Sequence, residues 1–233
     1  MGLENALYQP FKILDKREHQ NHRRRWVAGD VDSFRLIVTS SRLPPFQIKR
    51  ENSNFQVSAV KLFDVKTDTE VIDITDLIPS EEFYIKRFSG FDQIIHLGQS
   101  DLSADLPEGS FYLEITAGTQ SWYSEAFTVR ALNENDLSAN NCNLLKLTWS
   151  HSCDIAGFYY SDPDADFSHK LILEADLSPS EWLTASAGAE DGEGVFFPDY
   201  QRAAKEWRFE IFAPEYIVDA IALLPLHNSV YVE

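Results

Sequence analysis

The 233-residue sequence contains little cysteine and no long apolar segment. It has 2 cysteines and 1 methionine, and it lacks the run of about 18 apolar residues that a membrane-spanning helix needs. Its first residues lack the basic and apolar parts of a secretory signal peptide. We therefore expect no membrane span, and maturation in a reducing cytoplasm where Cys142 and Cys153 stay free thiols.

The sequence also lacks the short motifs of common catalytic and nucleotide-binding sites. It contains no P-loop, no G-x-G-x-x-G, no G-x-S-x-G and no H-E-x-x-H. Its 37 acidic residues form many neighbouring pairs, but none lies in a recognisable glycosidase or nuclease context. The sequence therefore predicts a protein that is not an enzyme and binds no cofactor. A hydrolase stays a third reading, which would need a pocket with two convergent carboxylates about 5–9 Å apart.

One acidic segment partly matches a calcium-binding loop. Asp162, Asp164 and Asp166 occupy its first, third and fifth positions. The sixth position, which should be glycine, is Phe167, and the twelfth, which should be glutamate, is Leu173. This pattern favours a turn with exposed carboxylates, and a weak ion site shared with a neighbouring subunit is the alternative.

A second segment places a histidine beside a thiol. His151, Cys153 and Asp154 are close in sequence, with Cys142 eleven residues before Cys153. A structural zinc site would need paired short spacings such as C-x-x-C, and none is present, although His169 could contribute if the fold brings it near. A nucleophilic cysteine would need a base and an oxyanion hole. Packing in loops and core is the favoured reading, so we predict no metal site.

Charge is distributed unevenly along the chain. The formal net charge is −17, so the phosphate backbone should repel the protein and we expect no nucleic-acid partner. Residues 1–25 are the exception, because six basic and three acidic side chains give +3 and leave −20 for the remainder. A basic segment on an acidic body suits docking onto an acidic protein surface; nucleic-acid binding by its arginine and tryptophan residues is the weaker alternative. The predicted protein-interaction residues are Lys16, Arg17, Arg23, Arg24, Arg25 and Trp26.

The pattern of apolar residues predicts a mainly β fold with two domains of roughly 100 residues. Residues 1–32 show no sustained period and are interpreted as an extended arm. From Ser33 the sequence alternates with period two, and about seven short runs separated by turn residues predict an antiparallel β-sandwich over 33–130. The predicted strands start around Phe34–Val38 and continue at Phe55–Val65, Glu70–Thr75, Phe83–Phe88, Gln93–Leu97, Phe111–Thr116 and Trp122–Val129.

Residues 131–142 are polar and are predicted to be a linker to a second β-rich, sandwich- or barrel-like domain at 143–233. Its predicted strands are Leu144–Trp149, Gly157–Tyr160, Lys170–Ala175, Val195–Phe197 and Glu206–Phe212, with a solvated loop at Gly188–Gly194. A helix is predicted after Pro214 because apolar residues follow at helical spacing. Pro225 would end it, and Val230–Val232 would be an edge strand. The domain should therefore end in a strand–helix–strand unit.

The first predicted domain resembles immunoglobulin-like and fibronectin-like sandwiches. Leu106-Pro-Glu-Gly109-Ser-Phe111 is similar to the Leu-x-x-Gly-x-Tyr pattern at the start of their penultimate strand. Phe111 stands where that pattern has tyrosine, so it cannot form the hydrogen bond of the tyrosine corner. The resemblance implies the strand pattern of such a sandwich and not the full corner.

The second half resembles uncharacterised virion proteins of Bacteroidota phages and prophages that are placed among tail or baseplate components. The segments that carry this resemblance are Leu145–Trp149, Phe167–Leu173, Glu193–Pro198, Lys205–Phe209 and Ala213–Tyr216. It implies a structural role in a particle, contacts with other virion proteins, and a homo-oligomer in a symmetric assembly made in the host cytoplasm. It assigns no role to any single residue.

Aromatic residues support a different function class, a module that binds surface glycans or a host receptor. Trp122, Trp149, Trp182 and Trp207 lie in predicted strands and could form an exposed platform. In sheets, such residues are more often core or interface anchors. The two readings differ in whether Trp122 and Trp182 are exposed on one sheet face.

Overall fold

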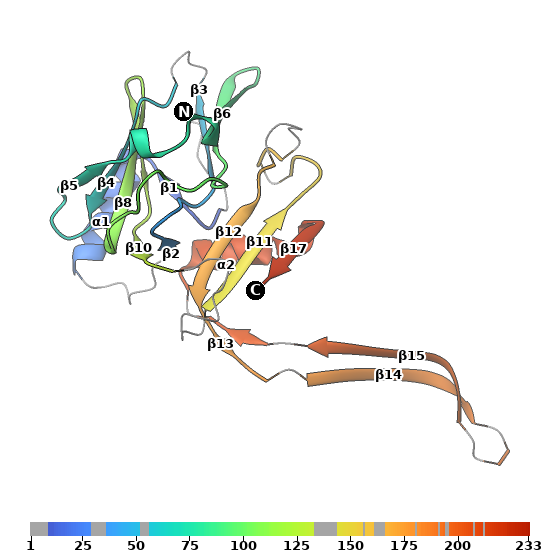
Figure 1. Ribbon diagram of the computed structural model, residues 1–233. Helices are drawn as coiled ribbons and strands as arrows, with labels where there is room; N and C mark the ends of the chain where they lie inside the picture. The colour runs from blue at the N-terminus through green and yellow to red at the C-terminus, as the bar shows by residue number, and fades with distance from the viewer. Residues whose placement is uncertain are drawn as a thin grey trace. The chain divides into compact units, whose positions relative to one another are not determined.

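The computed structural model of the protein is divided into two compact units, residues 1–173 with 213–233 and residues 174–212. The predicted mainly β fold, with a short helix and then a strand near the C-terminal end, is confirmed (Figure 1). The residues that the structure describes are 9–28, 36–51, 56–132, 144–155, 157–160, 166–179, 181–190, 192–193, 196–206, 208–211 and 213–233.

The first unit contains a ten-stranded sheet in the order β1-β9-β8-β10-β2-β12-β11-β17, with β4 paired to β8 and β5 paired to β4. A second sheet has the order β3-β7-β6. Most pairs are antiparallel, but β10 and β2 are parallel. The strands are β1 (Ile13–Leu14), β2 (Leu36–Thr39), β3 (Phe46–Glu51), β4 (Ala59–Asp64), β5 (Glu70–Asp73), β6 (Phe83–Arg87), β7 (Phe91–His96), β8 (Gly109–Ala117), β9 (Gln120–Ser124), β10 (Phe127–Arg130), β11 (Leu144–Ser150), β12 (His169–Glu174) and β17 (Ser229–Val232).

Aromatic side chains join the two sheets into a sandwich-like core. The ring centroid of Phe11, just before β1, lies 5.7 Å from that of Phe46 in β3 and 5.5 Å from that of Phe127 in β10. All three rings are buried. Since burial of a large apolar side chain stabilises a fold by about 1.5–3 kcal/mol, this contact ties the segment before β1 firmly to both sheets.

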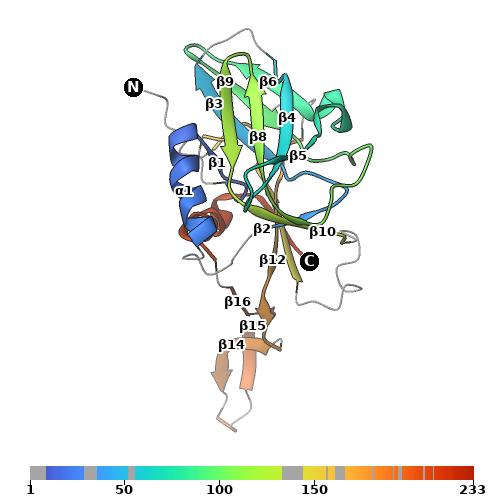
Figure 2. The same ribbon diagram turned by 90° about the vertical axis from the view of Figure 1, so that its left-hand side faces the viewer.

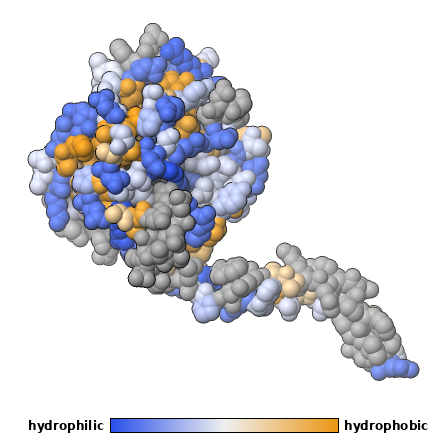
Figure 3. Space-filling view, in the orientation of Figure 1, coloured by the Kyte–Doolittle hydropathy of each residue, from blue (hydrophilic) through white to orange (hydrophobic). Residues whose placement is uncertain are grey.

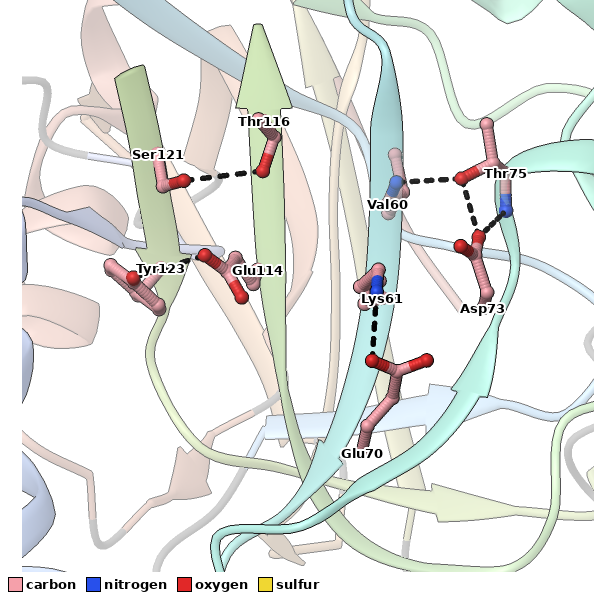
Figure 4. A network of polar contacts seen from close by, with 9 residues as sticks. All are labelled: Val60, Lys61, Glu70, Asp73, Thr75, Glu114, Thr116, Ser121 and Tyr123. Carbon is pink, nitrogen blue, oxygen red and sulfur yellow. Dashed lines mark hydrogen bonds and ion pairs between the residues drawn. The ribbon is translucent and has the colours of Figure 1, made fainter. Parts of the chain in front are cut away.

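The other face of β5, β4, β8 and β9 is polar, as period-two alternation predicts (Figure 4). The hydroxyl of Tyr123 donates a hydrogen bond of 3.1 Å to Glu114 on the neighbouring strand. Lys61 Nζ lies 2.8 Å from Glu70 Oε2, and Lys61 is also directly opposite Glu114. These side chains thus satisfy one another's polar groups across neighbouring strands.

The predicted boundary at 131–142 does not separate the two compact units. Strand β2 pairs with β10 on one side and with β12 on the other, where Ile37 is opposite Ile172. Ile37, Leu144 and Ile172 share a small apolar cluster, so strands from both predicted domains belong to one sheet. Turn residues indicate where the chain reverses, but not which strands then pair. Residues 133–143, which contain most of the predicted linker, lie outside the described residues.

The second unit is a two-stranded antiparallel ribbon. Its strands are β13 (Asp176–Leu177), β14 (Glu181–Glu190), β15 (Phe196–Glu206) and β16 (Phe209–Glu210). Strand β13 pairs with β16 and β14 pairs with β15, with a register shift between Ala187 and Gly188. The solvated loop predicted from Gly188 is shorter, because β14 continues to Glu190. We name residues 174–212 the ribbon.

The C-terminal part of the first unit is close to the prediction. Helix α2 (Glu215–Ala222) starts after Pro214 and buries Ile217 and Ala220. A 3-10 turn at Leu224–Leu226 follows, with two more at Thr75–Leu77 and Ser80–Glu82. Strand β17 then lies at the edge of the large sheet, paired only with β11 among the described strands.

Several strand assignments differ from the prediction. The largest is β14, a ten-residue strand that was not predicted. Strand β3, which was not predicted, pairs with β7 along its whole length. The segment Gly157–Tyr160, predicted as a strand, forms only an isolated bridge between Ile155 and Phe158. Its aromatic side chains are instead buried against β6 and β7, so their apolar character reflects core packing rather than pairing in a ladder.

Candidate interaction surfaces

The predicted extended arm is wrong for its central part, which forms helix α1 (Lys16–Ala28). Strand β1 comes before it and pairs with β9 (Figure 2). Asp15 caps the helix, because its Oδ1 accepts hydrogen bonds from the backbone N–H groups of Arg17 at 2.7 Å and Glu18 at 2.8 Å. The capping pattern Asp15-x-x-Glu18 was the missed signal. No helical period accompanies this pattern, because α1 has almost no aliphatic residues.

The cap should be needed for the stability of this region. We expect Asp15→Ala to lower the free energy of unfolding by about 1 kcal/mol, because two N–H groups lose their acceptor. Asp15→Asn should retain most of that stability. Guanidinium denaturation measures both, with the exposed Asp105→Ala as a matched control. Equal stability of Asp15→Ala and Asp105→Ala would contradict the role of the cap.

One face of α1 packs on the polar face of β8 and β9. The His19 ring centroid lies 4.5 Å from the centroids of both Tyr112 and Tyr123. Trp26 packs against the small cluster that contains Tyr112 and Ala126. Burial lowers the pKa of His19 to about 4, and the nearby Arg23 acts in the same direction, so the ring is neutral near pH 7. The helix is thus held largely by aromatic stacking.

A histidine–carboxylate hydrogen bond and an ion pair flank this aromatic contact. His22 Nδ1 lies 3.0 Å from both carboxylate oxygens of Glu125, a residue at the irregular step between β9 and β10. Arg23 Nε lies 2.9 Å from Asp68 Oδ1, and Asp68 also accepts a 2.5 Å hydrogen bond from the Tyr112 hydroxyl. Burial, followed by Asp68, raises the pKa of Tyr112, so the hydroxyl stays a donor. These contacts fix the position of the inner face of α1.

The outer face of α1 is exposed and basic. Residues 19, 22, 23 and 26 recur at spacings of three and four, so they share the inner face. The other residues of 16–25 are exposed. The six predicted interaction residues are therefore divided. Arg23 and Trp26 belong to the inner contact and are half-buried. The exposed four, which we name the basic face, are Lys16, Arg17, Arg24 and Arg25.

The ribbon presents a second exposed surface. All six residues of Glu181–Ser186 are exposed, although their side chains alternate between the two faces. Trp182 is 68% exposed and Leu183 is 51% exposed. Among the described residues of this unit, no third strand and no helix covers either face. Both faces of β14 are therefore open to contact.

The other tryptophans do not form an exposed platform. Trp122 is 6% exposed and Trp149 is 2% exposed, so both are core residues. Trp207 lies outside the described residues. On the face of the first unit shown in Figure 3, polar and apolar side chains are interspersed. The pairing of Trp122 with Trp182 as a binding surface is thus inconsistent with the burial of Trp122.

The sequence contains two partial motifs, the histidine–thiol segment and the segment similar to a calcium loop. Their described residues have ordinary local contacts. The backbone N–H of Cys153 donates to His151 Nδ1 at 3.0 Å, and Cys153 is an exposed free thiol. The backbone oxygen of Asp166 accepts a hydrogen bond from Gln99. Asp162, Asp164 and Cys142 lie outside the described residues. Among the residues that are described, no group of three or more His, Cys, Asp or Glu is placed to hold a metal ion.

The comparisons with known proteins identify no family for this chain, because no protein-family model matches it and no curated protein matches it significantly. Within the part of the chain that the structure describes, no helix has the length and apolar character needed to cross a membrane.

Proposed function

We propose that this chain is a structural subunit of a bacteriophage or phage-like particle, associated with the tail or baseplate, which works through contacts with neighbouring subunits. The observation that carries the proposal is the ribbon, with ten- and eleven-residue strands that no other described element of its unit covers. A two-stranded ribbon alone is at best marginally stable in water, and three strands or a packed helix are normally needed. Contact with a neighbouring subunit would supply that missing layer.

Exposed apolar residues on the ribbon support the same conclusion. Interface anchors are typically tryptophan, tyrosine and other large side chains that become buried on association. Trp182 and Leu183 are neighbours on β14 and so point to opposite faces. A partner that covers either face would bury one of them. A role in spacing and contact also fits a particle built from many copies of small β-rich subunits.

The basic face of α1 supplies an electrostatic contact of a different kind. Four cations are clustered on one exposed helix surface of a chain whose net charge is −17. An acidic surface, such as that of another copy, would be attracted to it. Because exposed charges are screened over about 8–10 Å at physiological salt, the attraction should weaken as salt rises.

Charge reversal tests the basic face better than deletion of residues 1–25. Deletion would also remove Phe11, Ile13 and Leu14 from the core and unfold the protein. We expect Arg17→Glu with Arg24→Glu to weaken subunit association about tenfold or more in low salt. Sedimentation velocity at high chain concentration, in about 50 and 500 mM salt, measures this, and the difference should shrink at the higher salt concentration.

The matched control for this experiment is Lys66→Glu with Arg87→Glu, which makes the same charge change at exposed positions outside α1. It should leave association close to that of the wild type. Equal weakening by both double variants would mean that net charge, and not the basic face, governs association.

The particle assignment itself is tested in the native setting. Particles released from the host that encodes this chain are purified on a density gradient and their proteins identified by mass spectrometry. The chain should be found in the particle fraction at a fixed ratio to other structural proteins. Its absence from particles whose other structural proteins are all detected would refute the assignment.

The glycan-binding alternative now depends on Trp182. Among the tryptophans whose exposure the structure describes, only Trp182 is exposed. That is weak support for a sugar platform, whereas an interface anchor needs only one. A glycan array separates the two readings: we expect no binding by the wild-type chain. Binding that Trp182→Ala abolishes without loss of folding would instead favour the alternative.

A further inference from the structure

The outer edge of β17 is the feature that the proposed contacts do not use. In the β11–β17 ladder, Lys146 and Glu233 exchange backbone hydrogen bonds of 2.9 Å in both directions. Antiparallel pairs alternate between hydrogen-bonded and non-hydrogen-bonded residues. Ser229 and Tyr231 therefore also bond to β11, whereas the N–H and C=O groups of Val230 and Val232 point away from it. These two residues present four backbone groups to the open edge.

The side chains of this edge are apolar and uncovered. Val230 is opposite Trp149 and Val232 is opposite Leu147, so the two valines lie on the sheet face whose neighbouring side chains are core residues. They are nevertheless 40% and 58% exposed, and Tyr231 on the other face is 65% exposed. Within the part of the chain that the structure describes, the apolar layer of the sheet thus ends at β17 with its side chains exposed.

The other edge strands of the first unit carry the protection that β17 lacks. Natural edge strands avoid unwanted pairing through short length or through charged side chains. Strand β1 has only two residues, and β5 has an acid at each end. Strand β6 ends in a lysine and an arginine, and β3 ends in lysine, arginine and glutamate. Strand β17 reads Ser-Val-Tyr-Val and has no charged residue.

We propose that the edge of β17 binds the β17 strand of a second copy, antiparallel and about a two-fold axis at Tyr231. Val230 would then be opposite Val232 of the partner subunit, and the outward backbone groups of these residues would form four hydrogen bonds. The two Tyr231 rings would be cross-strand neighbours on one face. The four valines would meet on the other face and extend its apolar layer.

A second copy fits this edge because the edge is self-complementary and uncharged. Two chains of net charge −17 repel each other over most of their surfaces, so contact is favoured where charge is absent. The nearest charged residue along this edge is Glu233, directly after β17, and Lys146 Nζ of β11 lies 2.5 Å from its carboxylate. In an antiparallel pairing centred on Tyr231, the outward N–H and C=O groups of Val230 and Val232 in each copy all find a hydrogen-bond partner in the other copy.

This inference deepens the proposed function, since it names one contact between subunits, but it makes a prediction for the purified protein alone. Four hydrogen bonds and six side chains form a small interface, so the dimer should be weak, with a dissociation constant of roughly tens to hundreds of micromolar. Sedimentation velocity over about 1–500 µM chain should show a monomer that becomes a dimer. A wild-type protein that stays monomeric throughout overturns the inference and leaves the particle assignment standing.

Two variants locate the dimer contact. Val230→Pro removes an outward N–H, and so two of the four hydrogen bonds, while every β11–β17 bond is retained. Val232→Lys places a charge at the edge. Each should weaken dimerisation about tenfold or more, with an unchanged urea midpoint showing that β17 still folds. The control Val71→Lys changes an exposed valine on the β5 edge in the same way and should leave the dimer intact. A dimer unaffected by both β17 variants overturns the inference.

Cross-linking tests the register. With Cys142→Ser and Cys153→Ser as background, Tyr231→Cys would place two thiols directly opposite each other, at a Cα separation within the range of a disulfide. Mild oxidation should give a covalent dimer in high yield, and Val71→Cys should give little. A low yield from Tyr231→Cys, equal to that of Val71→Cys, would contradict the two-fold register.

Discussion

The protein should lose stability steeply as the pH falls from about 6.5 toward 4, because three histidines are buried in their neutral form. Burial lowers the pKa of His19 to about 4 and that of His169 to about 3. Burial also lowers the pKa of His96, against an opposing effect of Glu82. In the unfolded chain each imidazole has a pKa of about 6.5. Below that pH the unfolded state therefore binds more protons than the folded state and is favoured.

The expected slope of the free energy of unfolding against pH follows from proton linkage. Three protons bound only by the unfolded chain lower the free energy of unfolding by about 4 kcal/mol per pH unit, a limit approached below about pH 5.5. Since domains are stable by about 5–15 kcal/mol, the protein should unfold well before pH 3. Urea denaturation at pH 7.5, 6.5, 5.5 and 4.5 measures the effect. A free energy of unfolding that is constant from pH 7 to 5 would contradict it.

A single variant tests how much of the pH dependence of the free energy of unfolding is due to His169. His169 lies among aromatic rings, 4.4 Å from Phe158 and 4.9 Å from Phe167 between centroids, and its Nδ1 has no hydrogen-bond partner. We expect His169→Phe to change stability little at pH 7.5, where the histidine is neutral, and to reduce the slope by about one third at pH 5. An unchanged slope would remove His169 from the explanation.

The second large effect concerns the ion pair between Arg50 and Asp92, which are opposite each other on β3 and β7. Arg50 Nη2 lies 3.5 Å from Asp92 Oδ2, and the two side chains are 1% and 2% exposed. Asp92→Leu should lower the free energy of unfolding by about 3–5 kcal/mol, because it leaves the buried guanidinium charge without its carboxylate. Chemical denaturation of the purified chain measures the loss.

A double variant separates the ion pair from simple packing. Replacing both partners, as Arg50→Met with Asp92→Leu, removes both buried charges and should recover most of the stability lost in the single variant. The control is Asp101→Leu, which breaks the exposed pair with Arg42 and should cost less than about 1 kcal/mol. If the double variant is as unstable as the single one, packing and not charge explains the loss.

Strand positions were predictable where one face is buried and the other is not. In β4 and β8 the apolar residues alternate with polar ones, and buried residues such as Leu62 and Leu113 match the period. Tyr112 is the exception, because it is buried on the other face against α1. The helix after Pro214 was predictable for the corresponding reason, since it buries one stripe at helical spacing. These elements have a local pattern that matches their surroundings.

Helix α1 was not predicted because its contact surface is made of histidine, arginine and tryptophan. Polar aromatic residues such as His19 give no apolar period, and their burial depends on Tyr112 and Tyr123, about 100 residues later in the chain. The six predicted interaction residues consequently form one undivided set at the level of the sequence. Only the docking of α1 shows that Arg23 faces inward and Arg24 outward.

The sequence by itself determined the β-rich class, most strand positions, the C-terminal helix and edge strand, and the segment that carries the basic face. The tertiary structure alone decided that β12, β11 and β17 extend the sheet of the first half, that residues 174–212 form a ribbon, and which tryptophans are buried. The physical reason is that period and capping are local properties, whereas strand pairing and burial depend on contacts between distant residues such as Ile37 and Ile172. Three surfaces are proposed for assembly: the basic face, the ribbon and the β17 edge. All three depend on contacts between residues that are distant in the sequence.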